Sequence, residues 1–456
     1  MKKRRLLSVF LLLGLALTML APQRAAALDE IEIDARAALL VEANTGEILY
    51  AKNIHQENYP ASITKVMVAL LVFEAIDEGR LTMDTPVTAS ETAAAALPAG
   101  ATTANIQPGE VLTVEQLLYC LLIPSANEAG NILAEAVSGS IEAFVARMNG
   151  RARELGCENT HFVNPHGLHD DDHYTTAWDI YLITAEALKH DRFLEICNSK
   201  SYELPPTNLS AKRTFHSTNY LISNWYALGY LYNGAQGIKT GTTPEAGRCL
   251  VSSAVRGSRR LISVVLGAER VQQPNGKYLV KCFSETARLF DYGFDNFTSK
   301  TILTASEPIR EVPVTLSGEA NYVVVHPAET LKRMLPNDLA PEDLTRTVTL
   351  HSESVEAPVA AGDELGTITL SHGDTVYGTV PLLALTDVSA SWVLVAQRDA
   401  LAFLAQKWVK LAGLGLVLLI LLIAVLRIAL SNRRRRYGRR RRQDYSRTGY
   451  RGRRRR

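Results

Sequence analysis

The feature that most constrains the fold of this 456-residue chain is a run of eight consecutive apolar residues at positions 66–73. A helix that is apolar on all sides must be buried, so the run predicts a helix at the centre of a domain. Ser62 and Lys65 stand just before this run. If they lie in the first turn of the helix, their spacing places both side chains on one face, where they can touch.

Such a pair suggests nucleophilic chemistry. Serine is a weak nucleophile until a base takes its proton. Lysine can act as that base only when partial desolvation lowers its pKa toward the working pH. We therefore interpret Ser62 as a candidate nucleophile and Lys65 as its base. For the pair taken alone, the alternative of a helix-capping Ser62 and a solvated Lys65 stays open.

The formal charge of the chain is concentrated at its ends. The net charge is +2, but residues 431–456 hold fourteen Arg and one Asp, and residues 1–27 add five basic residues, so the rest carries −16. We therefore expect no nucleic-acid binding by the folded body. Residues 1–27 combine a basic start, an apolar core and Ala25-Ala26-Ala27. This pattern predicts a secretory signal peptide, with a buried core helix as the alternative.

Neither the cysteines nor the histidines predict a metal site. The five cysteines are odd in number and widely spaced, which is untypical of a disulfide framework or a zinc site. The loop at 161–176 is dense in His and Asp, which are metal-ligand types. Pro165 and Gly167 interrupt regular ligand spacing there, and Asn and Asp are common turn formers. We interpret the loop as turns and expect no metal or other cofactor.

Strand and helix signals mix between residues 28 and 298. Two strands around a turn at 44–46 precede the Ser62 helix, and a hairpin joins strands at 249–255 and 261–266. We expect the strand that carries Lys239 to lie beside this hairpin at a sheet edge. Further helices are expected at 114–123 (capped by Thr113), 128–137, 141–155 (capped by Ser140), 178–190 and 283–292. The pattern predicts an α+β domain, an antiparallel sheet flanked by helices.

The pattern of apolar and polar residues changes beyond about residue 297. Short alternating segments separated by Gly and Asp predict a small all-β domain at 305–395, a spacer or a partner surface. Its expected strands are 312–316, 322–325, 345–350, 366–370 and 376–382.

The chain ends in an apolar run followed by the basic tail. Residues 411–426 are uncharged, and snorkelling of Arg427 extends the run to residue 430, near the ~20 residues that span hydrocarbon. We predict a transmembrane helix at 409–430. The Arg-rich tail at 431–456 then lies in the cytoplasm, against anionic lipid heads, with the folded body outside. The alternatives are a buried core helix and an RNA-binding arm.

Three short motifs follow one another along the chain. They are Ser62-x-x-Lys65, Ser125-x-Asn127 and Lys239-Thr240-Gly241. This triple, in this order, occurs in class A β-lactamases and penicillin-binding proteins. Its presence overturns the reading of Ser62 as a mere helix cap.

Each motif residue has a physical task in acyl transfer. Ser125 can relay a proton to the leaving amine, and Asn127 can hold both Lys65 and a substrate amide. Lys239 keeps neighbouring pKa values low and attracts a carboxylate. Gly241 lets a substrate backbone approach the strand edge. Thr240 and Thr242 offer hydroxyls to a terminal carboxylate, while the backbone N–H groups of Ser62 and Thr242 form an oxyanion hole.

The chain resembles the low-molecular-mass penicillin-binding proteins, the serine-type D-alanyl-D-alanine carboxypeptidases of peptidase family S11. Beyond the triple, the resemblance covers residues 37–53, 59–67 and 237–250 and the loop Phe162-Val163-Asn164-Pro165-His166-Gly167-Leu168. It implies a β-lactamase/transpeptidase-like domain. The substrate would be a peptidoglycan stem pentapeptide ending in D-Ala-D-Ala. Ser62 would be acylated, the last D-alanine released and the ester hydrolysed, and β-lactams would trap the same serine.

The chain also departs from this family. Its apolar run predicts a true membrane span, whereas many relatives use an amphipathic anchor. Some members clamp the substrate carboxylate with an arginine beyond the third motif; here Lys281, Arg248 and Arg260 are all candidates. The sequence is compatible with carboxypeptidase, endopeptidase and transpeptidase action.

Two rival functions remain to be compared. A β-lactamase shares the triple, but we find no Glu-x-x-Leu-Asn segment that would activate a deacylating water. A wall-binding protein with a relict site would bind stem peptides without releasing D-alanine.

Overall fold

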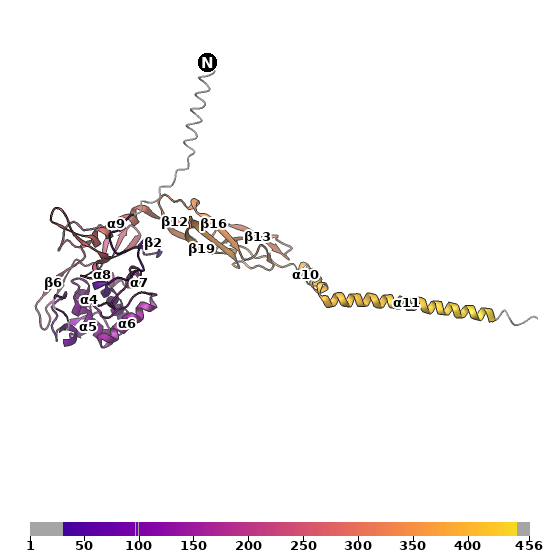
Figure 1. Cartoon of the computed structure of the whole chain (residues 1–456), viewed down its shortest axis with the longest axis horizontal. Coiled ribbons are helices and arrows are strands. Elements are labelled where there is room, and N and C mark those ends of the chain that lie inside the picture. Colours follow the sequence, from indigo (N-terminus) through magenta and orange to yellow (C-terminus); the bar gives the residue numbers. More distant parts are fainter. Residues whose placement is uncertain (1–30, 96, 99, 445–456) are drawn as a thin grey trace, which may run out of the picture. The chain divides into compact units, whose positions relative to one another are not determined.

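The computed structural model describes residues 31–444 except 96 and 99. The expected signal peptide at 1–27 and the end of the basic tail lie outside the described residues. The chain divides into two compact units, which Figure 1 shows coloured along the sequence. The first unit comprises Met1–Ile302 and Lys332–Asp343, and the second comprises Leu303–Leu331 and Leu344–Arg456.

A five-stranded sheet with the order β2-β1-β9-β8-β7 forms the framework of the first unit. Its strands are β1 (Ala37–Glu42), β2 (Ile48–Lys52), β7 (Ala235–Thr243), β8 (Gly247–Arg256) and β9 (Arg259–Ala268). All neighbouring strands pair antiparallel. As the sequence predicts, β8 and β9 form a hairpin, and β7, which carries Lys239, lies at the edge of the sheet.

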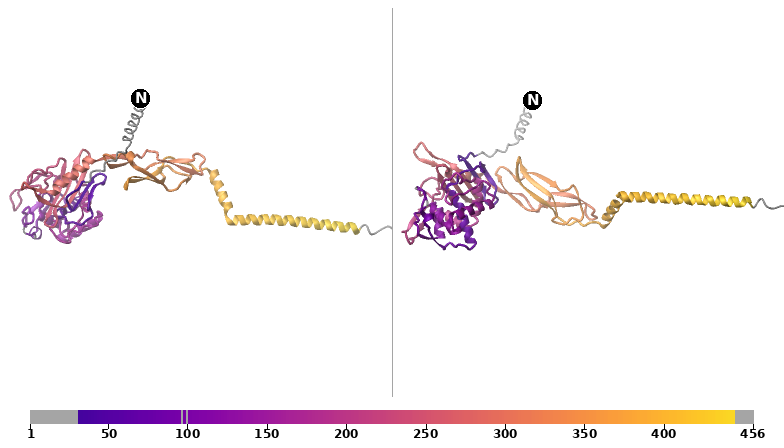
Figure 2. Two further views of the ribbon diagram at one scale, coloured as in Figure 1. Left: turned by 45° about the horizontal axis from the view of Figure 1, so that its top comes forward. Right: turned by 60° about the horizontal axis from the view of Figure 1, so that its bottom comes forward.

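Apolar side chains cover both faces of this sheet, because successive residues of a strand point to opposite sides. In β1, Leu39 and Val41 pack into one buried cluster, and Ala38 and Leu40 pack into another. The first cluster is covered by the helices that precede β7 in sequence, and the second by α9 (Lys281–Asn296). Figures 1 and 2 show this arrangement of helices on the two sides of the sheet.

Two helices of the first unit begin at the capping residues that the sequence predicts. Thr113 and Gln116 form a reciprocal capping box, and the Ser140 hydroxyl accepts a hydrogen bond from the backbone N–H of Ala143. Both predicted caps are confirmed. The helices that precede β7 in sequence, apart from α2, are α3 (Glu91–Ala95), α4 (Val114–Leu122), α5 (Asn127–Ser138), α6 (Ile141–Glu154), α7 (Ala177–Ala187) and α8 (Asp191–Cys197).

Four pairs of short strands lie outside the five-stranded sheet. These pairs are β3 (Pro86–Thr88) with β4 (Val111–Thr113), β5 (Ser201–Leu204) with β6 (Arg213–His216), β10 (Arg270–Gln272) with β11 (Tyr278–Val280), and β12 (Phe297–Leu303) with β15 (Leu331–Pro336).

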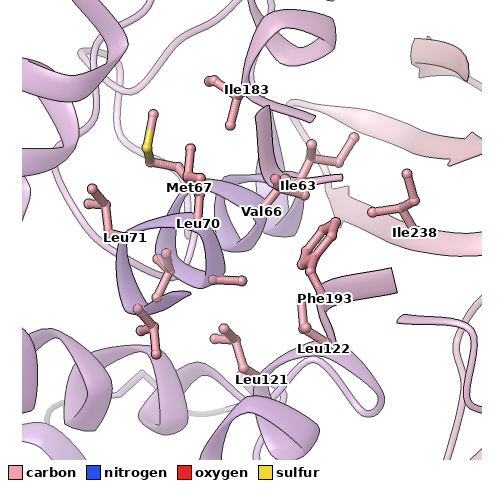
Figure 3. Close-up of a cluster of buried hydrophobic side chains, with 14 of the residues drawn as sticks. Ile63, Val66, Met67, Leu70, Leu71, Leu121, Leu122, Ile183, Phe193 and Ile238 are labelled. Atoms are coloured by element: carbon pink, nitrogen blue, oxygen red, sulfur yellow. The ribbon is translucent and has the colours of Figure 1, made fainter. Parts of the chain in front are cut away.

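The helix at the centre of the first unit is α2 (Lys65–Asp77), whose residues 66–73 are all buried, as the sequence predicts. Figure 3 shows side chains of α2 packed among residues from other elements. The labelled neighbours include Leu121 and Leu122 of α4, Ile183 of α7, Phe193 of α8 and Ile238 of β7, together with Ile63 just before α2.

Ser62 lies one element earlier than expected. It belongs to a 3₁₀ turn, η1 (Ala61–Thr64), and the α-helix begins only at Lys65. Residues i and i+3 eclipse one another in a 3₁₀ turn, so the two side chains still meet.

The second unit is built on a six-stranded sheet of order β16-β18-β19-β14-β13-β17. Its strands are β13 (Arg310–Thr315), β14 (Tyr322–Pro327), β16 (Thr345–Leu350), β17 (Val355–Glu356), β18 (Glu364–His372) and β19 (Thr375–Ala384). Together with the first unit, it confirms the predicted fold class, an α+β domain followed by a small all-β domain.

Two helices, α10 (Trp392–Ala405) and α11 (Lys407–Asp444), follow that sheet. Within α11, the 27 residues Lys407–Arg433 are long and apolar enough to cross a membrane. The large apolar side chains of this stretch are about half exposed or more, so no other described part of the chain buries them. An apolar helix of this length and exposure is compatible with a single-pass anchor.

The five cysteines are all free and buried in the first unit. Burial raises the pKa of the Cys120 and Cys157 thiols to about 12. These thiols are therefore protonated core residues, as the sequence indicates.

Candidate active site

The turn that carries Ser62 is held in place by the loop that the sequence singles out for its histidines. Gly167 of this loop has a φ of +81°, and a Cβ atom there would overlap the backbone carbonyl of Ala61. The Thr64 hydroxyl donates to the Ala61 carbonyl at 2.8 Å and lies 2.8 Å from Nε2 of His173. The glycine therefore permits a close packing that fixes the position of Ser62.

Lys65 is completely buried and meets four oxygen atoms. Its Nζ atom lies 2.8 Å from Oγ of Ser62 and 3.3 Å from Oγ of Ser125. It also lies 2.6 Å from Oδ1 of Asn127 and 3.0 Å from the backbone carbonyl of His166. The structure thus brings all four candidate catalytic residues together around one nitrogen.

Three influences act on the pKa of Lys65. Burial lowers it well below the usual value, and the neighbouring charge of Lys239 lowers it further, while Glu128 raises it. Desolvation of this kind favours the neutral amine. The lowered pKa suits Lys65 to the role of proton acceptor.

Ser125 and Asn127 reach the site from the connection between α4 and α5. Ser125 adopts a left-handed backbone conformation with a φ of +70°, and Asn127 is the first residue of α5. The Asn127 backbone N–H donates to the Thr102 carbonyl at 2.9 Å. The next residue, Glu128, is buried and accepts hydrogen bonds from the Thr103 hydroxyl at 2.6 Å and from the backbone N–H of Ala104 at 2.7 Å. Glu128 therefore fixes the position of the loop at residues 102–104, which forms one wall of the site.

The third motif reaches the site along the sheet edge. Burial lowers the pKa of Lys239 to about 7, and its Nζ atom donates to the Thr240 carbonyl at 3.0 Å. A Cβ atom on Gly241 would lie 2.7 Å from the Pro60 carbonyl oxygen and 3.1 Å from the Ser62 nitrogen. Glycine at this position lets β7 approach the nucleophile turn.

A cleft of about 190 Å³ opens at these residues. Ser62 and Ser125 line it together with Thr240, Gly241 and Thr242. Thr240 Oγ1 lies 2.6 Å from Oγ1 of Thr218. The remaining lining residues are Thr102, Pro124, Thr218, Tyr220, Arg248, Cys249, Val280, Cys282 and Phe283.

The structure separates the three candidates for a carboxylate-binding cation. Arg248 lies opposite Thr242 in the β7–β8 pair and donates to its hydroxyl at 3.2 Å. Lys281 instead pairs with Asp34, and Arg260 donates to Oε1 of Gln236 at 2.8 Å. Of the three, only Arg248 lines the cleft that contains Ser62.

The His- and Asp-rich loop at 161–176 contributes a backbone group to the site. Oδ1 of Asn164 accepts the backbone N–H of Gly167 at 2.6 Å, which shapes the turn whose His166 carbonyl contacts Lys65. Burial, with a smaller contribution from the charge of Lys65, lowers the pKa of His166 to about 3. Burial likewise lowers the pKa of His173 to about 4. Among the described residues, no group of three or more His, Cys, Asp and Glu side chains has the geometry to hold a metal.

Sequence reasoning missed two contributors to the site. Glu128 directly follows the second motif, and this adjacency is the signal that could have indicated it, because its burial is seen only in the structure. The His166 carbonyl lies in a loop that the family resemblance marks, but its role depends on a fold that brings residues 65 and 166 together.

Comparison with known proteins gives two family matches. Residues 22–270 match the D-alanyl-D-alanine carboxypeptidase family model, and residues 297–390 match the C-terminal domain of penicillin-binding protein 5. The D-alanyl-D-alanine carboxypeptidase DacF of Bacillus subtilis (strain 168) is 33% identical over 84% of this chain and 95% of its own length. The D-alanyl-D-alanine carboxypeptidase DacC of Escherichia coli (strain K12) is 31% identical over 83% and 92%, respectively.

Solved structures agree with these matches. The D-alanyl-D-alanine carboxypeptidase DacD of Francisella tularensis shares 25% identity with a TM-score of 0.67, covering 82% of this chain and 98% of its own. Penicillin-binding protein 5 of Haemophilus influenzae shares 27% identity with a TM-score of 0.63, covering 80% and 100%. Both the folding pattern and the sequence therefore point to the same family.

Proposed function

The chain belongs to the D-alanyl-D-alanine carboxypeptidase family, peptidase S11, and from this premise we propose that it acts through an acyl-enzyme on Ser62. It is a serine-type carboxypeptidase, and the substrate that we assign to it is the D-Ala-D-Ala end of a peptidoglycan stem pentapeptide. The observation that carries the assignment of Ser62 is the 2.8 Å contact between its Oγ atom and the buried Nζ atom of Lys65.

Acylation begins with proton transfer from Ser62 to Lys65. The Ser62 oxygen attacks the carbonyl carbon of the penultimate D-alanine, and the oxygen of that carbonyl gains negative charge. The backbone N–H groups of Ser62 and Thr242 stabilise this charge. The short separation between β7 and the Ser62 turn at Gly241 supports this pairing of donors.

Collapse of this intermediate releases D-alanine. The C–N bond breaks, and the leaving nitrogen takes the proton from Lys65 through the hydroxyl of Ser125, whose Oγ lies 3.3 Å from Nζ. Water then attacks the ester, which restores the Ser62 hydroxyl and frees the shortened peptide. A β-lactam would form the same ester and block the site.

The carboxylate of the terminal D-alanine is bound, in this proposal, by Thr240, Thr242 and Arg248. Charge-assisted hydrogen bonds from a guanidinium suit a planar carboxylate. Lys239, buried next to Thr240 in β7, adds positive charge. This arrangement requires a free carboxylate beside the scissile bond, as a carboxypeptidase does.

The location that we propose is the cell membrane. Lys407–Arg433 would span it once, with the first unit outside and the arginine-rich tail at 431–456 inside, because basic residues flanking a span favour the cytoplasmic side. The tail would then contact anionic lipid heads.

The test uses the full chain in detergent. Incubation with a labelled penicillin, followed by digestion and mass spectrometry, should place the adduct on Ser62. Incubation with a stem pentapeptide should release D-alanine. An adduct on another residue, or release of D-alanine by the Ser62→Ala variant, would contradict the proposal. Sustained turnover of a chromogenic cephalosporin would instead indicate a β-lactamase.

A further inference from the structure

The exposed apolar side chains of the first unit gather in one loop. Among its described residues, eight large apolar side chains are strongly exposed, and four of these eight lie between positions 225 and 231. They are Trp225, Tyr226, Leu228 and Leu231, and Leu228 is 78% exposed. Apolar side chains that gather at a surface in this way mark a place of contact with another surface, whereas single exposed residues do not. We call residues 224–231 the aromatic loop.

The aromatic loop lies within an uncharged segment. Residues 217–238 contain no Asp, Glu, Lys or Arg. Transfer of an ionised side chain out of water is costly, so a segment without such side chains can enter a less polar medium. The composition of the loop therefore suits contact with a medium less polar than water.

Contacts with neighbouring elements hold the loop in place while its side chains stay exposed. The Tyr230 hydroxyl accepts the backbone N–H of Val280 at 2.8 Å and donates to the carbonyl of Tyr278 at 3.3 Å. The Trp225 ring stacks on His216 with 3.5 Å between the ring centroids, yet Trp225 is 64% exposed. The exposure therefore belongs to a loop that the fold itself fixes.

The segment that carries the loop also forms part of the active-site cleft. Thr218 and Tyr220 line the cleft that contains Ser62. Trp225 follows Tyr220 closely in sequence, and its stacking partner His216 directly precedes the cleft-lining part of the segment. A surface that covers the aromatic loop would therefore lie beside the mouth of the cleft.

A lipid bilayer is the surface that best matches this loop. The chain also contains Lys407–Arg433, which is long and apolar enough to cross a bilayer, so a bilayer suits this chain at a second place. Trp and Tyr favour the boundary between lipid and water, and apolar side chains beside them enter the acyl region. A saccharide would suit the two rings of Trp225 and Tyr226. It also requires hydrogen-bonding groups, which the side chains of Leu228 and Leu231 lack.

We propose that the aromatic loop inserts into the headgroup boundary of a lipid bilayer and holds the mouth of the Ser62 cleft at that surface. Four side chains at this depth give reversible binding, so α11 remains the proposed anchor and the loop orients the first unit. At the bilayer, the cleft meets stem peptides carried by a lipid more often than stem peptides in solution, because enzyme and substrate share one surface. This substrate preference rests on the proposed function, and the insertion of the loop does not.

Fluorescence of the full chain in vesicles tests the insertion. The chain is reconstituted in phosphatidylcholine vesicles with or without bromine on the acyl chains, because bromine quenches tryptophans that reach the lipid. Subtracting the spectrum of Trp225→Phe isolates the emission of Trp225. The same subtraction with Trp178→Phe isolates that of Trp178, a half-buried residue of α7. We expect at least a twofold loss of Trp225 emission and no loss for Trp178. Unquenched Trp225 would overturn the proposal.

A charge in the loop tests the effect on substrate choice. Leu228→Glu places a carboxylate where the proposal places lipid. It should lower kcat/KM at least fivefold for a stem pentapeptide joined to a lipid in the same vesicles, and leave hydrolysis of a soluble pentapeptide within twofold of the wild type. Leu209→Glu is the matched control, because Leu209 is an exposed leucine between β5 and β6, outside the aromatic loop. The control should leave both rates unchanged.

The other outcomes of this comparison contradict the proposal. Equal losses on both substrates would show that Leu228 shapes the cleft, and no loss on the lipid-borne substrate would show that the loop does not set access to it. A loss on a soluble disaccharide pentapeptide, with the free pentapeptide unaffected, would assign the loop to a saccharide. A wild-type chain that leaves the soluble pentapeptide intact would contradict the proposed function, whereas the quenching of Trp225 would still decide the insertion.

Discussion

The Oδ1 atom of Asn127 lies 2.6 Å from the Nζ atom of Lys65, closer than any other hydrogen-bonding partner of that lysine. Amide and backbone carbonyl oxygens can only accept hydrogen bonds. A neutral amine has two N–H groups and one lone pair. When Asn127 and the His166 carbonyl use the two N–H groups, the lone pair is left for a serine hydroxyl. The contacts of Lys65 thus match those of a neutral base.

Removal of the base should abolish acylation. We expect Lys65→Ala to slow formation of the penicillin adduct by at least about 10²-fold, the lower range for loss of a general base. Stopped-flow acylation with a fluorescent penicillin measures this rate. Circular dichroism provides the control for folding. A folded variant that acylates at the wild-type rate would exclude Lys65 as the base.

The charge of Glu128 should set the acidic limb of the pH–rate profile. Because Glu128 raises the pKa of Lys65, we expect Glu128→Gln to lower that pKa. Lys65 is active when deprotonated, so the acidic limb of acylation should move to lower pH. Glutamine keeps an oxygen for the Thr103–Ala104 contacts. Glu135→Gln, farther along α5, is the control, and an unchanged limb in the Glu128 variant would contradict this electrostatic role.

The contact between β7 and the nucleophile turn should tolerate no side chain at Gly241. A Cβ atom there would meet backbone atoms of Pro60 and Ser62, which cannot move as a flexible side chain would. We expect Gly241→Ala to reduce the acylation rate at least about tenfold. Gly150→Ala, in α6 with open space around it, should keep full activity and gain up to about 1 kcal/mol of stability. Equal activity in the two variants would contradict the close approach.

Arg248 should discriminate between a free carboxylate and its amide. A hydrogen bond to a charged group contributes about 1.5–3 kcal/mol, so Arg248→Ala should lower kcat/KM for a D-Ala-D-Ala peptide about 10- to 100-fold. A peptide ending in D-alaninamide should be hydrolysed slowly by both proteins, with little difference between them. Steady-state release of the C-terminal residue measures both. The same loss on both peptides would show that Arg248 acts on the site without binding the carboxylate.

Membrane attachment should depend on the apolar stretch of α11. The full chain should stay with membranes after a carbonate wash, and a variant that ends at Gln406 should be soluble and retain D-alanine release. Fractionation with an activity assay measures both. A truncated variant that still resists the wash would place the anchor elsewhere. Protease treatment of intact cells tests the orientation, because a tail at 431–456 inside the cell should be protected.

Contacts of the site between residues close in sequence were predictable, and contacts between distant residues that the fold brings together were not. The meeting of Ser62 and Lys65 follows from a spacing of three within one turn, and the caps Thr113 and Ser140 act on residues close in sequence. The role of His166 depends on a backbone carbonyl, which every residue possesses, so no residue type signals it. Likewise, the choice of Arg248 over Lys281 and Arg260 depends on the register that sets it opposite Thr242, which residue types alone do not determine.

The dependence of Lys65 on partners near residues 62, 125 and 166 has a practical consequence for experiments on this protein. Each partner lies on a different stretch of chain, and the glycines at 167 and 241 let the loop that carries His166, and also β7, pack against the turn that carries Ser62. A partly folded chain would lack at least one of these contacts and could not form the β-lactam adduct on Ser62. If Ser62 forms the proposed adduct, labelling by a fluorescent β-lactam counts completely folded molecules, and it can follow folding of this enzyme in mixtures where spectroscopic probes of secondary structure cannot be used.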